Sequence, residues 1–349
     1  MAVFRYLQLM PILRYIWLPL LLAAFACHQP RETHRAFYHW KQRYEPAPGE
    51  SQALQQLGVT KLYVKCFDID RQADNAVPVA ITDLRAPFPD SALIIPVVFI
   101  MNEVWQRQDS NWTTEIARRT AELLEQVCRN IPQERIPEIQ LDCDWTRSTR
   151  EPYFAFLRAI RREPFFQNRL LSATIRLHQV KYSAGSGVPP VDKGLLMCYN
   201  MGDLRKPGDH NSIIDLNTLR AYTGKDRIST YPLPLDFALP LFEWDVLFRK
   251  GQYAGLTRNM PVQNEQVFRP AGEFSYNVVK DTAIGGIRLH PGDVIRHEDS
   301  PPDVLKKAAR QLSDQRQPGE PTIIFYHLEP GILKKYDLHE LETIYRLFG

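Results

Sequence analysis

Two neighbouring segments of the chain carry alternating polar side chains of the kinds that do acid–base chemistry. Asp142 and Asp144 alternate with apolar residues in one segment, and Arg176 and His178 do so in the next. Alternate side chains of a strand lie on the same face, so each pair points the same way. Because a buried charge is costly unless it is paired, we expect Asp142 to pair with Arg176. Asp144, nearer the strand end, is then left to act on a ligand.

Two later segments add candidate ligand-binding groups. Tyr199 and Asn200 end an apolar run, and the hydroxyl of Tyr199 could donate to a substrate oxygen or to a neighbouring carboxylate. Glu243 and Trp244 end another such run. Glu243 is the glutamate best placed for acid–base work, with a salt bridge at the rim as the alternative. Trp244 could stack on the face of a sugar.

Strands that alternate with helices must position these groups. Apolar or alternating runs predict strands over residues 36–44, 61–69, 92–101, 138–145, 170–178, 193–200, 236–243 and 322–328. Helical patterns occupy residues 52–57, 113–130, 152–162, 216–222, 302–312 and 338–348. Eight strands that alternate with helices predict an α/β fold, specifically a (β/α)8 TIM-like barrel.

Residues 246–320 interrupt this alternation, so they predict an insertion after strand seven. A β-hairpin is expected within it, turning at Lys250-Gly251, and a helix follows. In a closed barrel, alternate side chains of each strand face the lumen. The apolar sets of strands four and five must face the helices. The polar sets, which hold the acid–base candidates, therefore face the lumen together.

The first 27 residues have the pattern of a bacterial export signal. The run from Ile16 to Ala26 is apolar and too short to span a bilayer as a helix, and small residues precede Cys27. We therefore expect lipid attachment at Cys27 and anchoring to a membrane of the cell envelope, on its periplasmic or surface face. An ordinary secretory signal cut after Ala26 and a retained anchor are the alternatives. The predicted division is a lipoprotein signal peptide over 1–27, a tether over 28–35 and the barrel over 36–349.

Composition argues against several other functions. The net charge of +3 is too small to indicate nucleic-acid binding. No spacing of cysteines and histidines predicts a metal site, and no glycine-rich phosphate loop predicts a cofactor. Four cysteines follow the signal, and we expect them to be buried free thiols, although Cys128 and Cys143 could meet. They are Cys66, Cys128, Cys143 and Cys198.

The fourth predicted strand carries a resemblance to a known family. Residues Ile139–Thr146 (IQLDCDWT) resemble the signature strand of chitinase-like glycoside hydrolases, which reads Asp-x-x-Asp-x-Asp-x-Glu. Residues Met197–Asn200 (MCYN) are similar to the strand-six Met-x-Tyr-Asp of that family. The resemblance covers residues 36–349 and implies a barrel that acts on a glycan. The chain also resembles exported barrel proteins of unknown function that carry a Gln-x-Asp-x-Asp strand.

The chain departs from the family pattern at three positions. The general acid of the family falls on Thr146, which cannot protonate a leaving group at useful rates. The first aspartate falls on Ile139, and the strand-six aspartate falls on Asn200. Asp142, Asp144 and Tyr199 carry over. The resemblance implies that Asp144 binds an acetamido group.

Three functions are compatible with these observations. One is a glycoside hydrolase with Asp144 as nucleophile or base and Glu243 as acid, whose carboxyl separation would decide between retention and inversion. The second is a lectin-like barrel that binds an oligosaccharide without catalysis, which Thr146 favours. The third is an envelope interaction protein that uses the insertion as its contact surface.

Overall fold

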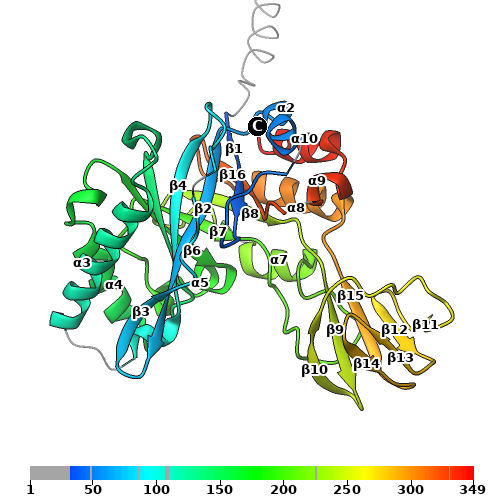
Figure 1. Ribbon diagram of the computed structural model, residues 1–349. Coiled ribbons are helices and arrows are strands. Elements are labelled where there is room, and N and C mark those ends of the chain that lie inside the picture. The colour runs from blue at the N-terminus through cyan, green and yellow to red at the C-terminus, as the bar shows by residue number, and fades with distance from the viewer. Residues whose placement is uncertain (1–31, 48, 85, 107–109, 225, 330) are drawn as a thin grey trace, which may run out of the picture.

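Eight parallel strands close into a barrel in the computed structural model, which describes residues 32–349 except 48, 85, 107–109, 225 and 330 (Figure 1). The first strand pairs with the second on one side and with the last on the other, which closes the ring. The barrel strands are β1 (His34–His39), β2 (Lys61–Gln72), β4 (Leu93–Ile100), β5 (Glu138–Asp142), β6 (Leu170–Arg176), β7 (Lys193–Met197), β8 (Leu235–Pro240) and β16 (Thr322–Tyr326). The predicted (β/α)8 barrel is therefore confirmed. The predicted signal peptide, with Cys27, lies outside the described residues.

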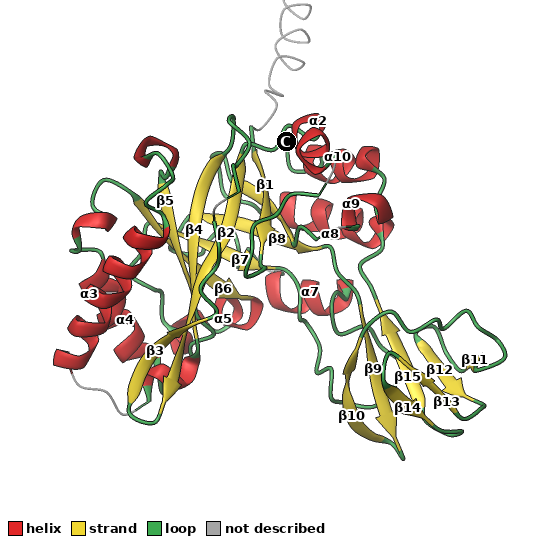
Figure 2. Cartoon of the chain, in the orientation of Figure 1, coloured by secondary structure: helices red, strands yellow, loops and turns green. Residues whose placement is uncertain are grey.

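Helices follow the strands and pack around the barrel (Figure 2). They are α2 (Glu50–Gln56), α3 (Ser110–Val127), α4 (Arg150–Ile160), α5 (Leu177–Lys181), α6 (Ser183–Ser186), α7 (Leu216–Thr223), α8 (Pro302–Ser313), α9 (Ile332–Lys335) and α10 (Leu338–Arg346). Asp215 caps α7, because its carboxylate accepts a hydrogen bond from the backbone N–H of Thr218 at 2.7 Å. None of the helices in the described part of the chain is both long and apolar enough to cross a membrane.

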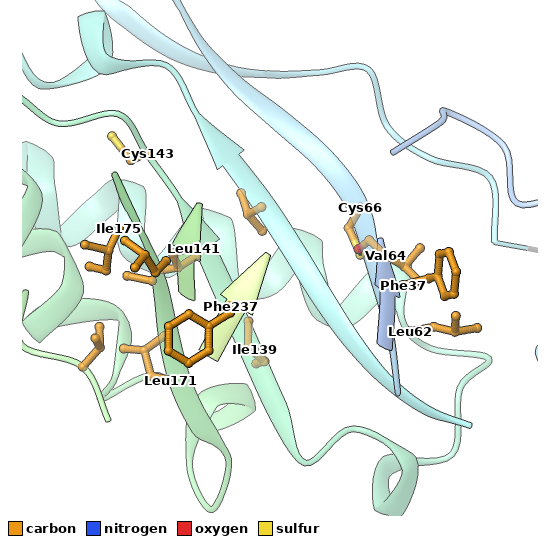
Figure 3. Close-up of a cluster of buried hydrophobic side chains, with 14 of the residues drawn as sticks. Phe37, Leu62, Val64, Cys66, Ile139, Leu141, Cys143, Leu171, Ile175 and Phe237 are labelled. Atoms are coloured by element: carbon orange, nitrogen blue, oxygen red, sulfur yellow. The ribbon is translucent and has the colours of Figure 1, made fainter. Parts of the chain in front are cut away.

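The alternation along β5 shows how the sequence builds the barrel wall. Ile139 and Leu141 are fully buried and face outward into the apolar layer beneath the helices (Figure 3). Gln140 faces the lumen, where its side chain accepts a hydrogen bond from the hydroxyl of Tyr38. The apolar set thus drives packing against the helices, and the polar set is placed inside. Within the described residues, the four predicted thiols are buried and free.

A separate antiparallel sheet follows β8, in strand order β10-β9-β15-β12-β11. Its strands are β9 (Trp244–Arg249), β10 (Gln252–Thr257), β11 (Phe268–Pro270), β12 (Ser275–Val278) and β15 (Val294–Glu298). The hairpin of β9 and β10 turns at Lys250-Gly251, where both residues have positive φ, as a tight primed turn requires. A second hairpin joins β13 (Thr282–Ile284) to β14 (Ile287–Leu289). These strands span residues 244–298, most of them within the predicted 246–320 segment, and from here on the name insertion refers to residues 244–298.

Outside the insertion, one strand of the described chain has no counterpart in the sequence prediction. β3 (Asn75–Val79) pairs antiparallel with the end of β2 and lies outside the closed ring. It contains Pro78, which a central strand does not tolerate but an edge strand does. The β2–β3 hairpin and the insertion extend from the same end of the barrel (Figure 1).

Candidate functional site

The carboxyl ends of the barrel strands surround a cavity of about 190 Å³. Asp142 is the last residue of β5, Arg176 of β6 and Tyr326 of β16. Because the barrel strands are parallel, their ends meet at one mouth, where barrel enzymes carry their active sites. The cavity is lined by Trp40, Phe99, Asp142, Asp144, Arg176, Met197, Tyr199, Asn200 and Tyr326.

Asp144 and Arg176 form an ion pair in this cavity. Nη1 of Arg176 donates to Oδ2 of Asp144 at 2.6 Å. The other oxygen of Asp144, Oδ1, is buried and has no hydrogen-bond partner among the described residues. The prediction that Arg176 pairs with Asp142 is wrong. In the parallel register of β5 and β6, Gln140 lies opposite Ser172. Asp144 and Arg176 each follow four residues later on the same face, so they lie level with each other.

Asp142 lies deeper than Asp144 and is only 8% exposed. Its Oδ1 accepts a hydrogen bond from the hydroxyl of Thr174 at 2.6 Å. Burial, and after it the negative charge of Asp144, raises the pKa of Asp142 to about 7. Near neutral pH this carboxyl therefore holds its proton for much of the time, and it can donate as well as accept a hydrogen bond.

Aromatic rings form much of the cavity wall. Tyr199 and Tyr326 are stacked, with ring centroids 5.1 Å apart and planes inclined by 23°. Trp40 meets Tyr326 edge-on at 5.7 Å and Phe99 at 6.1 Å. Burial raises the pKa of both tyrosines, so their hydroxyls stay protonated and can donate. The cavity thus combines apolar ring surfaces with a few polar groups, as small-molecule sites do.

Three of these rings were not among the residues selected from the sequence. Trp40, Phe99 and Tyr326 lie at or just beyond the ends of β1, β4 and β16. The sequence signal that could have identified these three residues is an aromatic side chain near the carboxyl end of a predicted strand. Trp40 carries that signal, but its position after a strand also fits a solvated loop residue. Phe99 and Tyr326 lie within apolar runs, where they read as ordinary core residues.

The prediction that His178 faces the lumen is wrong. β6 ends at Arg176, and the chain turns at once into α5, so His178 lies on a helix and is exposed. It is absent from the set of residues that line the cavity. The strand prediction ran two residues too far, and the alternation of lumen-facing side chains stops with the strand.

Glu243 and Trp244 lie beyond β8, outside the cavity lining. The carboxylate of Glu243 forms an ion pair with Lys335 and lies 3.9 Å from His297, so it occupies the rim salt bridge that the sequence left as an alternative. Trp244 begins β9, and its Nε1 donates to Glu298 at 3.0 Å. The predicted strand again extended past the observed one, because its apolar pattern runs on into the insertion.

Thr146 stands where the chitinase-like pattern that the chain resembles has its general acid, and it faces solvent. Its backbone N–H donates to the hydroxyl of Thr149 at 2.9 Å, and its own hydroxyl lies 3.0 Å from that of Ser148. The loop after β5 therefore contains a local hydroxyl cluster where the family pattern has a glutamate. Trp145 is 1% exposed and stacks on Tyr153, so it belongs to the outer layer.

A buried charge network closes the opposite end of the barrel lumen. Nζ of Lys193 lies 2.7 Å from Glu138 and 2.6 Å from Asp236. Ser172 donates a further hydrogen bond to Glu138 at 2.6 Å. Burial alone would lower the pKa of Lys193, but the two carboxylates together outweigh burial and raise it. These contacts make the lumen a packed core below the cavity.

The described residues contain no group of three or more histidine, cysteine, aspartate or glutamate side chains arranged to hold a metal ion. The chemistry available at the mouth is thus that of one ion pair, one buried carboxyl, two phenols and an amide. Together, the barrel and its mouth define a protein with the (β/α)8 architecture and a small aromatic cavity at the carboxyl ends of the strands.

Comparison with solved structures assigns the fold to the barrel of chitinases. The chitinase of Chromobacterium violaceum is 13% identical and has a TM-score of 0.50, over 91% of this chain and 99% of that one. The Group IV chitinase of Ostrinia furnacalis is 12% identical at the same TM-score, over 91% and 100%. The Bacillus megaterium spore cortex-lytic enzyme SleL is 11% identical, also at 0.50, over 92% and 75%. The predicted resemblance to chitinase-like barrels is confirmed for the fold. No protein-family model matches the sequence, and a search of curated proteins finds no match.

Proposed function

We propose that this protein binds a glycan at the mouth of its barrel, with one sugar ring inside the cavity. The observation that carries the proposal is the cavity itself, which joins aromatic ring surfaces to the Asp144–Arg176 pair at the carboxyl ends of the strands. Its volume of about 190 Å³ is below the roughly 300–1,000 Å³ of most small-molecule sites. A single ring is therefore expected to enter, with the remaining sugars outside.

The polar groups match the needs of a sugar. Oδ1 of Asp144 has no partner among the described residues, so it can accept a hydrogen bond from a hydroxyl or an amide N–H. The phenol of Tyr199 can donate to a sugar oxygen, and Asn200 can do either. Trp40 and Tyr326 offer apolar ring surface to the C–H groups of a pyranose. An open cavity also favours this proposal over a barrel that serves only as a scaffold for contacts at the envelope.

Binding without the family's catalytic mechanism is the form that the geometry supports best. Thr146 replaces the general acid and faces solvent. Glu243, the alternative acid, is held by Lys335 outside the cavity lining. Neither group is in a position to protonate a leaving oxygen above Asp144. The Asp144–Arg176 pair instead offers a fixed acceptor and a fixed donor to a bound sugar.

Hydrolysis is the second candidate, and one observation favours it. The pKa of Asp142 is raised to about 7, while neighbouring Asp144 is paired with a guanidinium. Two carboxyls in such different environments are the usual basis for separate acid and base roles. In this candidate mechanism Asp142 supplies the proton, and Asp144 is the base or nucleophile.

We also infer that the protein acts in the bacterial cell envelope. The apolar run that ends at Cys27 is typical of a lipoprotein signal, and it supports export and lipid anchoring. The glycan would then be a component of the envelope or of its surroundings. Chitin oligosaccharides belong in any test panel, because the solved neighbours of the fold include chitinases.

A glycan panel tests the proposal with two readouts, binding and release of reducing ends. Wild type, Asp144→Asn and the control Asp303→Asn are compared; the Asp303 carboxylate is 70% exposed on α8. The proposal predicts binding without release, lost in Asp144→Asn and kept in the control. If wild type released reducing ends and Asp144→Asn did not, the function would be hydrolysis and not binding alone. Absence of both signals for wild type would refute the proposal.

A further inference from the structure

We propose that Glu298 of the insertion is a positioning residue for the glycan cavity. The inference rests on the proposed function and assigns the insertion a part in it. Glu298 is the last residue of β15 and is fully buried. Its carboxylate binds Ser212, in the loop after β7, and Trp244, after β8, and each of these is connected in turn to residues of the cavity wall.

The carboxylate of Glu298 accepts hydrogen bonds on both of its oxygens. Oε2 accepts from the backbone N–H of Ser212 at 2.7 Å, from the hydroxyl of Ser212 at 2.5 Å and from Nε1 of Trp244 at 3.0 Å. Oε1 accepts from Nε of Arg296 at 2.6 Å. This one carboxylate therefore joins Ser212, Trp244 and Arg296 to one another.

The first connection to the cavity runs through the backbone of the loop after β7. The carbonyl oxygen of Ser212 accepts from the N–H groups of Met201 at 2.8 Å and of Gly202 at 3.1 Å. A Cβ at Gly202 would lie 3.0 Å from Cα of Ser212, so the two backbones are in close contact there. The preceding residue, Asn200, lines the cavity with a left-handed φ of 53°. The hydrogen bonds to Ser212 thus fix the chain directly after this residue.

The second connection runs through aromatic rings. Trp244, which donates to Glu298, packs against Phe242 with ring centroids 5.2 Å apart. Phe242 in turn contacts the two stacked tyrosines of the cavity wall, Tyr199 at 6.0 Å and Tyr326 at 5.8 Å. A shift of Trp244 would therefore be transmitted to both tyrosines through one intervening ring.

Arg296 completes the arrangement and is also fully buried. Its Nη1 donates to the carbonyl oxygens of Lys206 at 2.7 Å and Gly208 at 3.0 Å, and its Nη2 donates to that of Leu204 at 2.9 Å. Buried ion pairs add little net stability relative to well-packed apolar residues, and specifying one conformation is one role for which they are retained. Here the conformation specified is that of the loop after β7.

Glu298→Gln is the sharpest test, because it preserves size and removes one acceptor. One amide oxygen cannot serve both the Arg296 donor and the three donors from Ser212 and Trp244, so one side must face an N–H group. Ser212→Ala is a milder second variant that removes one hydroxyl donor and is expected to fold if the first does not. Asp293→Asn is the matched control, since Asp293 is a buried carboxylate of the insertion that pairs with Arg249 at 3.0 Å, away from the loop.

Two measurements are made on all four proteins: affinity for the best glycan of the panel, and amide hydrogen exchange of the loop. We expect Glu298→Gln to weaken binding at least tenfold and Ser212→Ala about threefold. The Met201 and Gly202 amides should exchange at least tenfold faster in Glu298→Gln. Asp293→Asn should change both quantities less than twofold, even if it lowers the melting temperature as much as Glu298→Gln does.

The possible outcomes separate this inference from the proposed function. Affinity unchanged in both Glu298→Gln and Ser212→Ala, beside a wild type that binds, would overturn the inference and leave the function intact. A wild type that binds no glycan would refute the function. Hydrogen exchange would then decide the inference, since unchanged protection of Met201 and Gly202 would show that Glu298 does not fix the loop.

Discussion

Replacing Asp142 by asparagine should remove a pH dependence from the free energy of unfolding. The carboxyl has an ordinary pKa of 3.8 when unfolded, and burial raises it to about 7 in the folded barrel. Below about pH 4 the group is protonated in both states, and its contribution to stability is fully present. As the pH rises toward 7, the unfolded chain releases the proton first. The free energy of unfolding therefore falls across this window.

The difference between the two pKa values corresponds to a loss of about 4 kcal/mol by pH 8, as an upper bound. The asparagine side chain of the Asp142→Asn variant cannot ionise, and its amide oxygen can still accept the hydrogen bond that Thr174 donates at 2.6 Å. The difference in unfolding free energy between variant and wild type should thus be near zero at about pH 4. By about pH 8 it should reach a few kcal/mol in favour of the variant.

Urea unfolding between pH 4 and pH 8 measures this difference directly. Asp303→Asn is the control for the exchange of a carboxylate for an amide, because the Asp303 side chain is 70% exposed on α8. The reasoning would be refuted if Asp142→Asn differed from wild type by a constant amount across the range. It would also be refuted if the variant were the less stable protein at pH 8.

Three further predictions follow from other parts of the molecule. Lys193→Met should lower the free energy of unfolding by about 3–5 kcal/mol, because it leaves Glu138 and Asp236 buried without their cation; a loss under about 1 kcal/mol in urea unfolding would contradict this. Trp40→Ala should weaken glycan binding about tenfold or more by titration calorimetry, since it removes a ring of the cavity wall; equal affinity would exclude a sugar from that ring. Cys27→Ser should abolish incorporation of labelled fatty acid in bacteria, and a variant that is still labelled would refute lipid attachment there.

The barrel could be predicted because its strands alternate cleanly. Ile139 and Leu141 separate Gln140 and Asp142, and this period of two assigns each side chain to the lumen or to the helices. The hairpin at Lys250-Gly251 followed from turn chemistry in the same way. β3 could not be predicted, because a five-residue edge strand with a proline carries no such pattern.

The site could be predicted only in part, because strand ends and register are not written in a single sequence. Asp144, Arg176 and Tyr199 do meet at the cavity, as their positions on predicted strands indicated. The partner of Arg176 depends on how β5 and β6 are staggered, which alternation does not determine. His178 was misplaced by a strand end that came two residues earlier than its apolar pattern.

The contribution of the insertion was also hidden from sequence reasoning. Glu298 and Ser212 are separated by 86 residues, and neither lies in a motif. Their contact exists only because β15 packs beside the loop after β7. Long-range hydrogen bonds of this kind require the folded structure.

The position of a bound glycan tests the central claim most directly. A crystal structure with the best ligand of the panel would locate the sugar. We predict one ring in the cavity, in contact with Trp40 or Tyr326 and hydrogen-bonded to Asp144 or Arg176. A glycan bound elsewhere on the protein, with the cavity empty, would contradict the proposal.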